Sequence, residues 1–334
     1  MNTTYTSASI AGTTQPDAVA AQAVAAAITA NVEMVLRGKT GPIRLALACL
    51  FAGGHLLIED VPGTGKTTLA KALAASIGGV SHRIQFTPDL LPTDITGVSV
   101  WDQERRVFEF RPGPIFANVV VADEINRASP KTQSALLEVM EEFQVTVDGT
   151  AHPVPAPFLV VATQNPIDLE GTYRLPEAQL DRFLMRIAVG HPDLAAEEEI
   201  ITGRARSALP ALRPVTSLED VWRVQRSVAS VHLAPEIARY IALLVAATRQ
   251  HDALRLGVST RGSLALARAA QAHAICTGRH FVVPDDVKAT AAPVLTHRLV
   301  LSAAAEVRGA SSAAVLAEIL NTVPVPALAG AAVR

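Results

Sequence analysis

Hydrophobic and polar positions follow two different patterns along this chain. Between about residues 55 and 190, short valine, isoleucine and leucine runs bounded by turn residues alternate with stretches of helical spacing. The runs are His55–Glu59, Val119–Ala122, Phe158–Thr163 and Leu184–Val189, with helices expected after Gly65, from about Pro130 to Phe143, and shortly before Phe183. Apolar strands alternating with helices are typical of a parallel sheet covered on both faces. The pattern therefore predicts an α/β domain.

The rest of the chain has helical patterning. An alanine-rich helix is expected after Asp17 and a second helix from about Pro42 to Ala52. Beyond Pro192 the strand signals end, and helical spacing recurs over residues 195–206, 218–229, 235–250 and 260–277. We predict a disordered arm over residues 1–16, an α/β nucleotide-binding domain over 17–191, a smaller all-helical domain over 192–322, and a flexible tail over 323–334.

Composition limits the classes of function. With 334 residues, 49% of them hydrophobic, the chain can bury the cores of two domains. Its longest apolar stretch, Leu45 to Gly54, is about half the length of a membrane-spanning helix, and the first residues lack the pattern of a secretory signal. We expect a cytoplasmic protein. A net charge of -2 lacks the excess of a general nucleic-acid binder, although a local patch or an assembled ring remains an alternative.

The segment from His55 to Ala74 carries the most specific chemical signal. An apolar strand, a glycine-rich turn and a helix follow one another, which is the context of a phosphate-binding loop. Glycines let backbone N–H groups face a polyphosphate, and the helix N-terminus adds its positive dipole end. The expected nucleotide-binding residues are Pro62, Gly63, Thr64, Gly65, Lys66, Thr67 and Thr68. Lys66 is expected to reach the β- and γ-phosphates of ATP, and Thr67 to ligate Mg²⁺.

One position departs from the usual loop motif. The first glycine of the motif falls at residue 60, where this chain has aspartate. We expect Asp60 to be tolerated only if its backbone keeps an ordinary conformation and its carboxylate points away from the phosphates.

Polar side chains follow two further expected strands. Asp123 and Glu124 end the second apolar run, and Asn165 follows the third. Because ligands of α/β sheets bind at the carboxyl ends of the strands, these groups are expected near the phosphates. Asp123 would hold the hydrated Mg²⁺, Glu124 would polarise the attacking water, and the neutral amide of Asn165 would orient that water. Taken alone, a pair of acids or an Asn-Pro turn is more often structural.

The chain resembles the AAA+ ATPases of the MoxR family, in the helix-2-insert branch. The resemblance runs from about Asp17 to about Thr322 and is carried by VPGTGKT, VVVADEINRASPKTQSALLEVMEE, VVATQNPIDLEGTYRLPEAQLDRFLM and STRGSLALARAAQAHA. It implies a AAA+ P-loop NTPase fold, a parallel sheet flanked by helices, followed by a helical lid. It also implies a homo-oligomeric ring, usually hexameric, with nucleotide between subunits.

The resemblance also implies roles for individual residues. Lys66 and Thr67 match Walker A, Asp123 and Glu124 match Walker B, and Asn165 matches the polar residue called sensor 1. Arg182 matches the arginine finger offered to the neighbouring subunit, and Arg261 matches the lid arginine called sensor 2. A cation supplied by a neighbour makes hydrolysis depend on assembly. Read without the family, Arg182 is more simply a surface ion pair, and Arg174 and Arg186 are rivals for the finger role.

Two hairpins resemble the insertions of that branch. Gly97–Trp101 and Val107–Phe110 flank a polar tip, and strands around 145–147 and 152–154 flank the turn Asp148-Gly149. Such hairpins are expected to project toward a pore or client, unless Trp101, Phe108 and Phe110 only pack on their own domain. Residues 141–159 contain no lysine or arginine, which speaks against tracking of a nucleic-acid strand.

These patterns lead to one functional hypothesis and three alternatives. The hypothesis is an Mg²⁺-dependent ATPase that acts on a protein client in chaperone-like maturation or metal-cofactor insertion. By resemblance, a protein with a von Willebrand factor A domain is an expected partner. The alternatives are a chelatase-like subunit, a DNA-processing motor, and a nucleotide-gated binding scaffold that rarely hydrolyses ATP.

Overall fold

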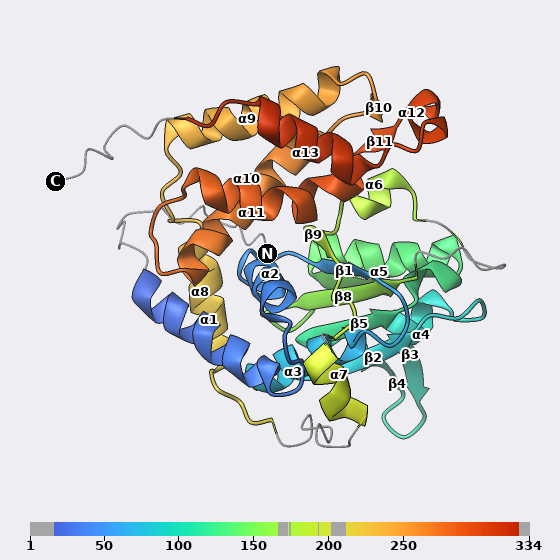
Figure 1. Cartoon of the computed structure of the whole chain (residues 1–334). Helices are drawn as coiled ribbons and strands as arrows, with labels where there is room; N and C mark the ends of the chain where they lie inside the picture. The colour runs from blue at the N-terminus through green and yellow to red at the C-terminus, as the bar shows by residue number, and fades with distance from the viewer. Residues whose placement is uncertain (1–16, 166–172, 174, 193, 202–211, 327–334) are drawn as a thin grey trace, which may run out of the picture.

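The computed structural model describes residues 17–165, 173, 175–192, 194–201 and 212–326 (Figure 1). A part with a central sheet lies below a group of helices from the C-terminal third of the chain. Within the described residues, no helix is both long and apolar enough to cross a bilayer. The cytoplasmic location stays a prediction.

The central sheet is parallel, as predicted. In the described part of the chain its five strands have the order β2-β5-β8-β1-β9. Their bounds are Ser81–Gln85 for β2, Val119–Asp123 for β5, Leu159–Gln164 for β8, Leu56–Glu59 for β1 and Met185–Ile187 for β9. Four of them match expected apolar runs. The edge strand β2 was not predicted, because Ile84 is its only buried residue.

Helices cover both faces of this sheet. Alternate residues of β1 enter different cores, with Leu56 and Ile58 in one and Leu57 in the other. The first core includes α1 (Ala18–Glu33), α2 (Thr40–Phe51) and α3 (Lys66–Ser76), and the second includes α5 (Pro130–Glu142) and the short α4 (Pro92–Thr96). The uninterrupted apolar runs therefore reflect burial from both sides.

The C-terminal helices form the lid. They are α8 (Leu218–Val228), α9 (Pro235–Gln250), α10 (Thr260–Cys276), α11 (Pro284–Leu295), α12 (Ala303–Val307) and α13 (Ser312–Thr322). Buried residues of α9, α10 and α11 belong to the same core as α1 and α2, so the lid is docked on the N-terminal helices. The helical lid is confirmed, and it also contains one short pair of strands that was not predicted. Strand β10 (Leu254–Leu256) pairs antiparallel with β11 (Val300–Leu301), and strands this short leave no periodicity in the sequence.

Helix α7 (Leu194–Ile201) lies apart from the lid. Figure 1 shows it on the far side of the molecule from α9, α10, α11 and α13. The boundary expected at residue 192 assigns α7 to the lid, whereas the helices that pack together begin at α8. The domain limits stay predictions, and the expected arm and residues 327–334 of the tail lie outside the described residues.

Both predicted hairpins are present. The first joins β3 (Gly97–Asp102) to β4 (Val107–Pro112), and the second joins β6 (Gln144–Val147) to β7 (Thr150–Pro153). The Phe110 ring stacks on His152 at a centroid distance of 4.0 Å, so this aromatic residue packs on its own domain. Trp101 and Phe108 instead pair with each other and stay 48% and 71% exposed. Packing on the domain is therefore confirmed for Phe110, and projection of Trp101 and Phe108 toward a pore or client stays a prediction.

Candidate functional site

The glycine-rich turn links the end of β1 to the start of α3. Gly63 and Gly65 have φ angles of 86° and 91°, a region that disfavours any residue with a Cβ atom. A Cβ on Gly65 would also lie 3.0 Å from Leu36 Cδ1. Gly65 caps α3, so the helix N-terminus begins with Lys66 inside the turn. The turn therefore has the backbone shape of an anion-binding loop.

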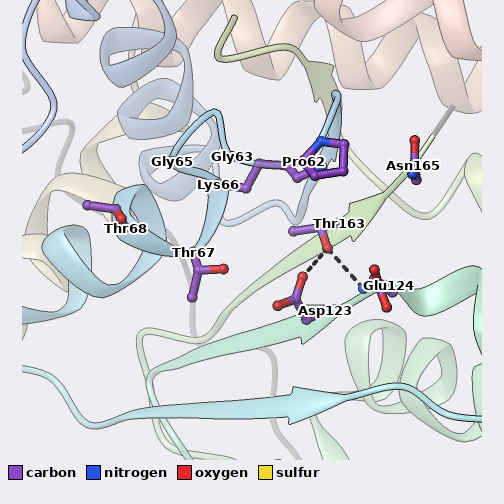
Figure 2. A pocket seen from close by; sticks show the side chains of 10 residues that line it. All are labelled: Pro62, Gly63, Gly65, Lys66, Thr67, Thr68, Asp123, Glu124, Thr163 and Asn165. Carbon is purple, nitrogen blue, oxygen red and sulfur yellow. Dashed lines mark hydrogen bonds between the residues drawn. The ribbon is translucent and has the colours of Figure 1, made fainter. Parts of the chain in front are cut away.

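Beside this turn lies a cavity of about 390 Å³ (Figure 2). The turn forms one wall, and the ends of β5 and β8 form the other. The cavity is lined by Pro62, Gly63, Gly65, Lys66, Thr67, Thr68, Asp123, Glu124, Thr163 and Asn165. Eight of the predicted residues around Lys66 and Asp123, together with Asn165, thus meet in one place. Thr64 differs: it is buried, and its hydroxyl donates to the Val61 carbonyl at 3.2 Å.

Asp60 meets both conditions that the sequence set for it. The φ angle of Asp60 is not positive, so its backbone avoids the left-handed region that favours glycine. Its Oδ2 accepts hydrogen bonds from the backbone N–H groups of Val189 and Gly190 at 2.9 and 2.7 Å, beyond the end of β9. Partial burial raises the pKa of Asp60, but hydrogen bonds from the N–H groups of Gly190, Val61 and Val189 and from the Thr64 hydroxyl outweigh that effect, and the pKa is lowered. The carboxylate therefore stabilises the end of β9, while the carbonyl of the same residue accepts a hydrogen bond from Lys66 Nζ at 2.5 Å.

Thr163 holds the two acidic residues in place. Its hydroxyl donates to Asp123 Oδ1 at 2.5 Å and accepts from the Glu124 backbone N–H at 2.9 Å. Glu124 has φ 56° and ψ 51°, a left-handed conformation that costs about 1–3 kcal/mol for a residue other than glycine. The hydrogen bond to Thr163 supports this strained backbone at the point where β5 ends. Sequence analysis missed Thr163, because a threonine at a strand end is ordinary.

Further polar groups contact the two carboxylates. Arg83 on β2 donates to Asp123 Oδ2 from Nη2 and Nε, at 2.6 and 3.0 Å. Glu124 Oε2 accepts from Gln85 Nε2 at 3.0 Å and from Arg127 Nη1 at 2.8 Å. The first two of these partners lie on the strand that the pattern failed to predict. Arg83 and Gln85 lie near the two carboxylates because β2 pairs with β5, and the sequence pattern did not predict this pairing.

The residues present fit an Mg²⁺ ion. Thr67 and Asp123 line the same cavity and offer a hydroxyl and a carboxylate, the hard oxygen donors that Mg²⁺ prefers. Magnesium sites of phosphate enzymes usually combine one or two such groups with substrate phosphates and water. Arg83 now neutralises Asp123, as a bound cation would.

The two predicted arginines meet at a second place. Arg182 follows the short helix α6 (Glu177–Leu180), and Arg261 lies in the first turn of α10. Glu141, near the end of α5, pairs with both, through Arg182 Nη2 at 3.1 Å and Arg261 Nη2 at 3.0 Å. Neither arginine lines the cavity. The cluster of Glu141, Arg182 and Arg261 is named the arginine cluster below.

The rivals of Arg182 have different settings. Arg186 on β9 pairs with Glu59 on the neighbouring β1, with 2.8 Å between Nη1 and Oε2. This contact joins two strands of the chain's own sheet. Arg174 lies outside the described residues.

The parallel sheet, the phosphate-binding turn and the helical lid together define a P-loop ATPase fold of the AAA+ class. A family model described as "ATPase family associated with various cellular activities (AAA)" matches residues 55–185, and one described as "AAA lid domain" matches residues 246–319. These two matches cover the sheet with its turn and most of the lid.

Similar proteins sharpen that assignment. The chain is 50% identical over 297 residues to YeaC of Bacillus subtilis, covering 89% of this chain and 93% of YeaC. It is 42% identical over 305 residues to the chaperone MoxR1 of Mycobacterium tuberculosis, covering 89% and 81%. The crystal structure of a candidate ATPase from Cytophaga hutchinsonii superimposes with a TM-score of 0.86 at 37% identity, covering 93% and 97%. This chain therefore belongs to the MoxR family of AAA+ ATPases.

Proposed function

We propose that this chain hydrolyses ATP at the seams of a homo-oligomeric ring, hexameric by resemblance, and uses the resulting movement on a protein client. One observation carries the first part. Lys66, Thr67, Asp123, Glu124 and Asn165, which come from three separate segments, line one cavity beside a helix N-terminus. This set supplies a phosphate cradle, a metal-binding pair and a water-activating pair.

Each residue has a defined task in this proposal. Lys66 binds the β- and γ-phosphates, and its present bond to the Asp60 carbonyl is given up when the nucleotide enters. Thr67 and Asp123 hold Mg²⁺, which when bound offsets charge on the phosphate oxygens. Glu124 accepts a proton from the attacking water, and Asn165 orients that water. To do so, the Glu124 carboxylate has to leave Gln85 and Arg127.

The arginine cluster supports an intersubunit site. Charge spread over the transferred phosphoryl group requires cations, and within the described residues Lys66 is the only basic side chain in the cavity. Arg182 and Arg261 are held together by Glu141 away from their own cavity. We assign Arg182 to the γ-phosphate of the neighbouring subunit. We extend this assignment to Arg261, which shares Glu141 with Arg182 and does not line its own cavity.

A protein client is the second part of the proposal. The relative MoxR1 is named a chaperone, and we extend that role here to chaperone-like maturation or metal-cofactor insertion. The exposed pair of Trp101 and Phe108 gives the first hairpin an apolar contact surface. The second hairpin has no lysine or arginine to hold a phosphate backbone. A partner with a von Willebrand factor A domain remains part of the proposal on family grounds alone.

An isosteric substitution that removes one negative charge tests the enzymatic part. Glu124→Gln is expected to lower phosphate release about 100-fold or more, since it removes the general base, while ATP binding persists. Glu138→Gln is the matched control, because Glu138 is exposed on α5 and does not line the cavity. Unchanged turnover in the Glu124 variant, with ATP bound, would favour the nucleotide-gated scaffold.

The same variant can test the client class. Held in ATP, Glu124→Gln should retain a protein client during affinity capture. If single-stranded DNA stimulates wild-type turnover, with a steep loss as salt rises, the DNA-processing alternative replaces the protein client.

A further inference from the structure

Arg298 is a buried arginine that the proposed reaction does not use. It ends the 3-10 helix Thr296–Arg298 after α11, and its side chain is only 4% exposed. Removing a guanidinium from water costs several kcal/mol unless its N–H groups find partners. All three of its nitrogens do so here. Nε donates to Asp181 Oδ1 at 2.6 Å, and Nη1 donates to the carbonyls of Val294 and Leu184.

The partners of Arg298 surround Arg182 in the chain. Nη2 donates to the carbonyls of Asp181 and Phe183, at 3.1 and 2.8 Å. These are the residues immediately before and after Arg182. His297, next to Arg298, also contacts the Phe183 carbonyl at 3.1 Å through Nε2. The lid therefore fixes the backbone on both sides of Arg182, whose own side chain reaches Glu141 instead.

Arg298 also contacts the helix that carries Arg261. Gly262 lies in the first turn of α10, and a Cβ atom there would be 3.1 Å from Arg298 Cδ and 2.3 Å from a Val258 methyl carbon. A side chain at position 262 would clash with Val258 and crowd Arg298, so this turn of α10 packs directly against the Arg298 side chain. Burial lowers the pKa of Arg298, Asp181 acts in the opposite direction, and the charge of Arg261 lowers it again, which places both arginines in one electrostatic environment.

We propose that Arg298 is a positioning residue that ties the lid to both arginines, so that lid position decides how Arg182 and Arg261 are presented to the neighbouring subunit. This inference rests on the proposed function. Arg298 does not line the cavity, and it donates to the Asp181 carboxylate and to backbone carbonyls. It acts through the backbone of the Arg182 loop and through the first turn of α10.

The geometry requires arginine and not merely a positive charge. A guanidinium offers five N–H donors in a rigid plane and can bind a carboxylate and several carbonyls at once. A lysine ammonium has three donors at a single point and cannot reach acceptors on both sides of Arg182. Arg298→Lys therefore keeps the charge and removes the fork, which separates positioning from electrostatics.

The test uses mixed rings, so that the variant can be placed in either partner of a seam. Lys66→Ala subunits lack a working phosphate-binding loop but supply intact arginines, and Arg182→Ala subunits do the reverse. Seams between the two should recover turnover if Arg182 acts on the neighbour's nucleotide. Arg298→Lys is then added to one parent or to the other. Arg279→Lys is the matched control, because Arg279 also pairs with a buried lid aspartate, Asp286, but follows the opposite end of α10.

The expected result is asymmetric. In the Lys66→Ala subunit, which supplies the arginines, Arg298→Lys should lower the recovered turnover about 10-fold or more, because small misplacements of reacting groups are costly. In the Arg182→Ala subunit, Arg298→Lys should change the recovered turnover by less than about twofold. The KM for ATP should not move in either case. Arg279→Lys should give no asymmetry.

Each other outcome counts against the inference. Equal losses from both placements would mean that Arg298 only supports folding, and the proposed function would stand. No recovery in the parental mixture, despite proven co-assembly, would overturn the trans role of Arg182 and this inference with it. If Arg298→Lys fails to fold, Asp181→Asn weakens the same contact from its partly exposed side, and the same asymmetry is expected.

Discussion

The cavity and the arginine cluster are two halves of one proposed reaction, and the protein builds them differently. The cavity is formed by a backbone turn and by the ends of adjacent parallel strands, so that sheet geometry brings Asp123 and Thr163 together. The arginine cluster is formed only by side chains, from α5, from the loop after α6 and from α10. The cavity is therefore fixed by the fold of a single subunit. The arginine cluster is held only by side-chain ion pairs, which can exchange for other partners.

This difference explains how assembly can control turnover. Ion pairs between partly exposed side chains are worth about 0.2–1 kcal/mol, and the side chains of Glu141, Arg182 and Arg261 are 30–50% exposed. The arginines can therefore leave Glu141 for the phosphates of a neighbouring subunit at little cost. The backbone beneath Arg182, in contrast, is fixed by the buried Arg298.

The largest expected effect comes from removing the arginine half. Arg182→Ala should lower kcat about 1,000-fold or more, because an arginine finger stabilises charge only in the transition state, and ATP binding should persist. Phosphate release and nucleotide titration measure the two quantities. Arg186→Ala is the control, and its effect should stay small because Arg186 pairs with Glu59 within its own sheet. A larger loss from Arg186→Ala would transfer the finger role to that residue.

A smaller effect is expected in the cavity half, at Asp60. Asp60→Ala removes a carboxylate that accepts the N–H groups of Val189 and Gly190, so the free energy of unfolding should fall by about 3 kcal/mol. ATP affinity should change little, because this carboxylate points away from the cavity. Denaturant unfolding and ATP titration check both statements. A large loss of ATP affinity with unchanged stability would show that Asp60 acts on the phosphates.

The smallest effect concerns His55, which links α5, the helix that carries Glu141, to strand β8. Its Nε2–H donates to the carbonyl of Met140, beside Glu141, at 2.9 Å, and its Nδ1 accepts from the Val160 N–H at 3.0 Å. Burial lowers the pKa of His55 to about 4. Below about pH 6.5 the unfolded chain therefore binds a proton at His55, whereas the folded chain does not until about pH 4. The free energy of unfolding should fall by about 2 kcal/mol between pH 7 and pH 5.

His55→Gln provides the comparison, because glutamine does not titrate. Its stability should depend less on pH over the same range, measured by denaturant unfolding at both values. His297 is also buried with a lowered pKa and contributes equally to both proteins. Identical pH profiles would mean that His55 does not titrate on unfolding.

The sequence predicts the cavity better than the arginine cluster, because local motifs form the cavity whereas contacts between distant segments form the cluster. The turn around Lys66 and the acids after β5 follow from short spacings and strand ends, which local pattern records directly. Thr163 and Arg83 act through pairing between strands, and β2 carries too few apolar residues to be recognised. Contacts of this kind depend on sheet register, which the order of residues alone does not reveal.

The arginine half was predicted only through family resemblance. Arg182 and Arg261 have no local signature that separates them from surface ion pairs, and Glu141 lies 41 and 120 positions away from them. Arg298 carried no signal either, because its partners are mainly backbone carbonyls. Residues that act by fixing a distant loop become visible only in the folded chain.

Turnover per subunit measured across a dilution series, with assembly state and ATP binding followed in parallel, tests the central claim most directly. On this account, phosphate release per subunit disappears as rings dissociate, while the single chain still binds ATP in its cavity. A dissociated monomer that hydrolyses ATP as fast as the assembled ring would contradict it.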